Sequence, residues 1–134
     1  MMQLRLDRQR VLEPDFGVTV SAVLDESVLR RPVGCPALMR GQLKHLGEVL
    51  RRPNVEVRVL PASIGLHPGL DGSFWLFKMP KPYPEVAYAE HLGGRLFMEA
   101  PKSKRYAEAY AQLQQMALGP TGSARLIATI AEEL

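Results

Sequence analysis

The chain has 134 residues, of which 46% are hydrophobic and 23% are charged, and its formal net charge is +3 at pH 7. These values are typical of a globular protein without a membrane anchor, so we predict a single domain over residues 1–134. No apolar stretch approaches the ~20 residues of a membrane helix, and the charged N-terminus does not resemble a signal peptide. Cys35 is the only cysteine, which excludes an internal disulfide and fits a cytoplasmic protein.

The first half of the chain alternates between helical and strand patterns. We expect a helix over Gln3–Leu12, and then a strand over Gly17–Leu24, which is rich in β-branched residues. Pro36–Arg51 has apolar residues at steps of three and four, which predicts an amphipathic helix. Val55–Leu60 alternates apolar and polar residues and is typical of a half-buried strand.

The second half opens with a loop over Pro61–Gly72, which contains three glycines and two prolines. Ser73–Phe77 is apolar on both faces and predicts a central strand. Two further strands, Glu85–Glu90 and Arg95–Met98, flank a glycine pair and predict a hairpin.

Two helices are expected to end the chain, one over Pro101–Leu118 and one that Gly119 caps and Pro120 begins. The apolar stripe Leu126–Leu134 of the last helix either closes the core or forms a homodimer surface. Together the elements predict an α/β fold of the α+β type, with helices packed on one mixed, mostly antiparallel sheet of four or five strands.

Two carboxylates close apolar strands and are candidate site residues. A carboxylate such as Glu26 or Glu90 at a strand end either caps the next turn or lines a cleft. Glu90 shares the parity of Val86 and Tyr88, so we expect it to point inward towards an arginine or hydroxyl partner. The arginines closest in sequence to Glu26 are Arg30, Arg31 and Arg40. A structural Glu–Arg bridge is a commoner outcome for such residues than a ligand-binding pair.

His67 lies in the glycine-rich loop, where it either binds a ligand or caps a neighbouring backbone group. The three histidines and the single cysteine do not have metal-ligand spacing, so we expect no metal and no cofactor. Arg30 to Arg52 includes six basic residues and one acidic residue but no aromatic residue. This pattern favours a solvated face over a nucleic-acid site.

Several blocks of residues resemble a known family. They include Val23–Gly34, Met39–Leu43, Asn54–Pro61, Gly65–Phe74 and Val86–Glu90. The chain resembles an actinobacterial domain of unknown function that lies C-terminal to helix-turn-helix DNA-binding domains of the Xre class. The resemblance implies the effector half of a transcriptional regulator, acting with small partner proteins. No helix-turn-helix precedes Arg8, so we expect either a fragment or a stand-alone relative.

From these observations we predict a sensing and protein-interaction module that does not itself bind DNA. A polar cleft beneath the Pro61–Gly72 loop would bind a small-molecule effector or a peptide of a partner protein. Its expected lining residues are Glu26, Arg30, Arg40, His67, Tyr88 and Glu90. The alternative is a small enzyme in which Glu26 or Glu90 is the general base and His67 assists.

Overall fold

The computed structural model describes residues 18–32, 34–68 and 72–134, and the expected helix over Gln3–Leu12 lies outside them. The described chain has mixed α/β structure, as the sequence predicts, with five strands in two separate sheets. The described residues up to Ala62, together with residues 117–134, form one compact unit, and the described residues of 63–116 form a second. We call them unit 1 and unit 2.

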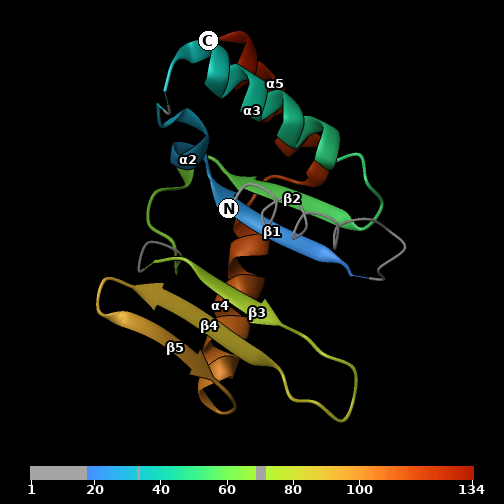
Figure 1. Cartoon of the computed structure of the whole chain (residues 1–134), viewed down its shortest axis with the longest axis vertical. Coiled ribbons are helices and arrows are strands. Elements are labelled where there is room, and N and C mark those ends of the chain that lie inside the picture. Colours follow the sequence, from blue (N-terminus) through green and yellow to red (C-terminus); the bar gives the residue numbers. More distant parts are fainter. Residues whose placement is uncertain (1–17, 33, 69–71) are drawn as a thin grey trace. The chain divides into compact units, whose positions relative to one another are not determined.

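Unit 1 is built on two parallel strands, β1 (Val20–Asp25) and β2 (Val55–Leu60). The connection between them contains a short helix, α2 (Glu26–Arg30), and a longer one, α3 (Pro36–Val49). A crossover of this kind is what parallel neighbours require. The last helix, α5 (Pro120–Glu132), packs alongside α3 and also contacts β2 (Figure 1).

The core of unit 1 lies where α3 and α5 meet β2. Its buried side chains come from α2, α3, β2 and α5, and are Leu29, Met39, Leu43, Val59, Ile127, Ile130 and Ala131. Three of these belong to the apolar stripe of the last helix. The core interpretation of that stripe is therefore confirmed for its buried residues.

The outer edge of β2 is closed at Val59 by the segment that begins α5. The Val59 amide donates to the hydroxyl of Ser123 at 2.8 Å, and the Val59 carbonyl accepts from the Leu118 amide at 2.9 Å. The Ser123 hydroxyl in turn donates to the Leu118 carbonyl at 3.2 Å. Ser123 is fully buried, and these bonds satisfy both its hydroxyl and the backbone amide and carbonyl of Val59.

Unit 2 is an antiparallel sheet with a helix packed on it. The strands are β3 (Phe74–Phe77), β4 (Val86–His91) and β5 (Gly94–Met98), with β4 in the middle. The helix α4 (Lys102–Met116) contacts β3 and β4. In Figure 1 the three strands are the yellow to gold arrows and α4 is orange.

The face of the sheet that packs on α4 is identified by its buried residues. Ala87 and Ala89 of β4 are buried, and Phe74, the cross-strand neighbour of Ala89, packs edge-to-face on Tyr106 of α4 at a centroid distance of 5.2 Å. Small alanines let the helix approach the sheet closely. Because side chains alternate between faces, Tyr88 and Glu90 lie on the opposite face.

Most expected elements are confirmed within a few residues, including the strand over Val55–Leu60, the hairpin and the helix that Pro120 begins. Two expectations are wrong. The strands do not form one sheet, because β1 and β2 pair only with each other among the described residues. The strand predicted to be central, Ser73–Phe77, lies at the edge of its sheet, and its apolar residues Trp75 and Phe77 are exposed.

Ser123→Ala should lower the free energy of unfolding by about 1–3 kcal/mol, because it leaves the Val59 amide buried without an acceptor. Thr129→Ala is the matched control, since the Thr129 hydroxyl donates to the Arg125 carbonyl of its own helix at an exposed position. The control should change stability by no more than about 0.5 kcal/mol. Urea denaturation followed by circular dichroism measures both, and equal losses in the two variants would contradict the role given to Ser123.

Candidate functional site

The candidate site begins where β1 ends and α2 starts. Asp25 is the N-cap of α2 and its carboxylate accepts from the Ser27 amide at 2.9 Å. Glu26 occupies the first turn and Arg30 the last, the placements that the helix dipole favours. This helix was not predicted from the sequence, although Asp25 followed by Glu26 is a helix-start signal.

The Glu26 carboxylate connects α2 with the start of the loop that follows β2. One of its oxygens accepts from the Ala62 amide at 3.0 Å, and the other accepts from Nε of Arg30 at 2.7 Å. The Arg30 guanidinium also donates to Glu133, just beyond α5, at 2.8 Å. Arg30 therefore joins α2 to the end of α5. We call Ala62, Glu26, Arg30 and Glu133 the α2 network.

The α2 network shifts the titration of both of its central groups. The backbone hydrogen bond from Ala62, followed by the bond from Arg30, lowers the pKa of Glu26 below its ordinary value of 4.5. The carboxylates of Glu133 and Glu26 raise the pKa of Arg30. Only 14% of the Glu26 side chain is exposed, so its charge is held in place by these partners.

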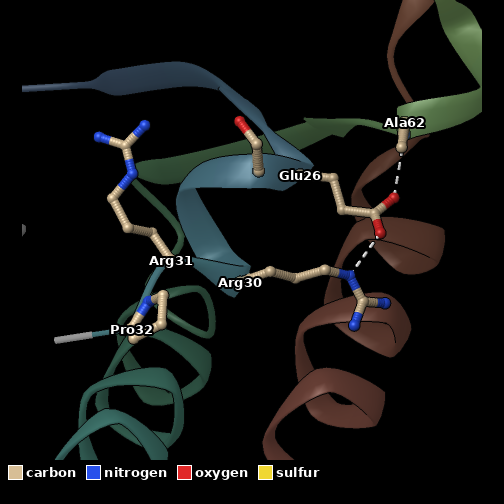
Figure 2. Close-up of a pocket in the computed structure, with 6 residues that line it drawn as sticks. Glu26, Arg30, Arg31, Pro32 and Ala62 are labelled. Atoms are coloured by element: carbon tan, nitrogen blue, oxygen red, sulfur yellow. Dashed lines mark hydrogen bonds and ion pairs between the residues drawn. The ribbon is translucent and has the colours of Figure 1, made fainter.

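An open hollow of about 430 Å³ lies beside α2 and is lined by Glu26, Ser27, Arg30, Arg31, Pro32 and Ala62. Figure 2 shows Glu26 and Arg30 bonded to each other on one side, with Arg31 extending away from them. The residues that line the hollow include one acidic and two basic ones, and Glu26 and Arg30 already bond each other there. Groups of both signs suit a ligand that itself carries both charges.

The structure brings together only part of the predicted set of site residues. Glu26 and Arg30 share the hollow, and the Ala62 amide at the start of the Pro61–Gly72 loop bonds Glu26. Arg40, also in unit 1, donates instead to the backbone carbonyl of Leu134. That bond holds the end of the described chain against α3.

The other predicted residues, His67, Tyr88 and Glu90, belong to unit 2. The expectation that Glu90 points inward is wrong, because the buried parity of β4 is that of Ala87 and Ala89. Glu90 is exposed and pairs with Arg95 on β5 at 3.4 Å. Tyr88 packs between two other rings, and His67 is half-buried in the loop. A cleft shared by residues of the two units stays a prediction.

Among the described residues there is no group of three or more His, Cys, Asp or Glu side chains placed to hold a metal ion. In the same part of the chain, no helix has both the length and the apolar character needed to span a bilayer.

Residues 1–129 match the family described as Domain of unknown function (DUF5753). The match covers nearly the whole chain, so the protein belongs to this family. Comparisons with curated proteins and with solved structures gave no match.

Glu26→Gln should lower stability at neutral pH by about 1 kcal/mol, because a neutral amide replaces a charged acceptor. The folded-state pKa of Glu26 is lowered, so its contribution is present above about 4.5 and is lost as the pH falls through the folded value. The melting temperatures of the variant and the parent should therefore converge as the pH falls from 4.5 through the lowered pKa of Glu26. Glu48→Gln, an exposed position on α3, is the control and should show no such convergence. A constant difference at every pH would contradict the assignment.

Proposed function

We propose that this chain is the sensing half of a transcriptional regulator. In this role the hollow beside α2 receives a small effector, or a charged side chain of a partner protein, and alters the activity of an associated helix-turn-helix domain. The resemblance to domains that follow Xre-class DNA-binding domains supports the regulatory assignment. The observation that carries the sensing role is the position of Glu26, which bonds both Arg30 and the Ala62 amide at the edge of an open hollow.

The α2 network suggests how binding is coupled to a change in conformation. A ligand with both an anionic and a cationic group would pair with Arg30 and Glu26 in place of their bond to each other. Such a ligand would also compete with Glu133 for Arg30 and with Ala62 for Glu26. It would therefore favour a different arrangement of α2, the loop start and the end of α5. A ligand shifts a conformational equilibrium only by such a difference in affinity between two states.

The enzymatic alternative receives less support from the same geometry. A general base is most effective when its pKa lies near the working pH. The pKa of Glu26 is instead lowered, and both of its oxygens already accept hydrogen bonds. A carboxylate in this state is better suited to binding a ligand than to abstracting a proton.

Zwitterionic probes test the proposal, and the twenty amino acids and a set of dipeptides at millimolar concentration are suitable. A probe present at ten times its Kd should stabilise the protein by about 1.4 kcal/mol, which raises the melting temperature by about 3–5 °C. Glu26→Gln and Arg30→Ala should abolish the shift, whereas Glu48→Gln and Arg125→Ala should retain it. Both controls replace charged groups outside the hollow.

The regulatory part is tested with the helix-turn-helix protein that we propose is associated with this domain. Its affinity for its operator should change when an active probe, or a small protein encoded beside it, is added. That change should disappear in Glu26→Gln. No probe shift, combined with operator affinity that neither Glu26→Gln nor Arg30→Ala alters, would overturn the proposal.

A further inference from the structure

The sheet face of unit 2 that points away from α4 carries an ordered set of side chains. Trp75 pairs with Tyr88, and Tyr88 pairs with Phe97, so one aromatic row crosses all three strands. The ring centroids are 5.4 Å apart for Trp75–Tyr88 and 4.8 Å apart for Tyr88–Phe97. On one side of this row lies the Glu90–Arg95 pair, and on the other lies Phe77 beside Val86. We call this surface the aromatic face.

The aromatic face is open, although its residues are those that proteins usually bury. Phe97 is 72% exposed, Trp75 is 47% exposed and Phe77 is 45% exposed. The opposite face of the sheet packs on α4 and forms the core of unit 2. The fold of unit 2 therefore does not require the aromatic face to be apolar. A contiguous apolar surface of this kind is typical of a binding interface. Aromatic side chains are also the commonest energetic anchors of such interfaces.

The charges of the face indicate which kind of partner fits it. Its strand residues include one anion, Glu90, and one cation, Arg95, with exposed fractions of 49% and 71% for their side chains. Single-stranded nucleic acid, which also stacks on aromatic rings, needs a surplus of cations that this face lacks. A face whose charges cancel and lie side by side is instead complementary to a copy of itself.

We propose that the aromatic face is the interface of a homodimer of this chain. The two sheets pack face to face, about 10 Å apart, around a two-fold axis that runs along the strands between β4 and β5. This axis places Arg95 of one copy opposite the partner's Glu90, and the reverse. It also places Phe97 opposite the partner's Tyr88, so the two aromatic rows overlap at these two rings.

The charge pair provides the decisive experiment. Glu90→Arg gives a face with two cations, and Arg95→Glu gives a face with two anions. Each variant alone should dimerise at least 10-fold more weakly than the parent chain, because like charges then face each other across the axis. An equimolar mixture should form a heterodimer, and the double variant E90R/R95E should recover the homodimer.

Sedimentation equilibrium of the full chain over about 1–200 µM measures these states, and circular dichroism confirms that each variant is folded. Lys104→Glu on the exposed side of α4 is the control for a change of charge and should dimerise as the parent does. Phe97→Ser should weaken the dimer by about 100-fold. A parent chain that stays monomeric, or single charge variants that dimerise as well as the parent, would overturn the proposal. A dimer that persists in Phe97→Ser would overturn it as well.

Discussion

The closure of the β2 edge at Val59 determines where the charged groups of unit 1 lie. A sheet of two strands exposes the backbone of both strands at its edges, and a buried amide or carbonyl there must find a partner. Ser123 and Leu118 supply those partners and thereby fix the first turn of α5 against the strand. The buried residues of α5 then set its direction along α3. As a result, Glu133, just beyond the end of α5, lies within hydrogen-bond distance of Arg30.

This arrangement explains how a five-residue helix persists at the candidate site. One helical turn is not stable by itself, because nucleation costs more than its few hydrogen bonds return. α2 is stabilised by its Asp25 cap, by the burial of Leu29, and by the two carboxylates bonded to Arg30. The bonds from Arg30 to Glu26 and to Glu133 are charge contacts at the surface of the protein. A segment that depends on a few such contacts changes position more readily than one held by core packing.

The fold was predictable from the sequence where local signals agree. The alternation of Val55–Leu60, the glycine pair of the hairpin and the Gly119–Pro120 start of α5 each correspond to an element in the structure. The burial of Ser123 was also predictable from the sequence. Ser123 lies four residues before Ile127 on the buried stripe of α5, and a polar residue on such a stripe requires a buried partner.

The candidate site was predictable only as far as its contacts are local. Arg30 follows Glu26 by four residues, a spacing that brings two side chains together on any helix. Ala62 is 36 residues from Glu26, and Glu133 is 103 residues from Arg30, so their positions depend on how the whole unit packs.

The wrong orientation of Glu90 has a different cause. Both faces of β4 carry apolar residues, and hydrophobicity alone favours the face with the larger ones, which holds Val86 and Tyr88. The structure buries the small residues Ala87 and Ala89, because a helix packs closely on them, and leaves the aromatic row open. Polar residues at the positions of Trp75 and Phe97 would serve the folding of unit 2 equally well, because both side chains are exposed. Large apolar side chains that stay exposed, against the usual preference for burial, commonly mark a functional site. The sheet therefore has two different faces, one that packs on α4 and one that carries an open aromatic row.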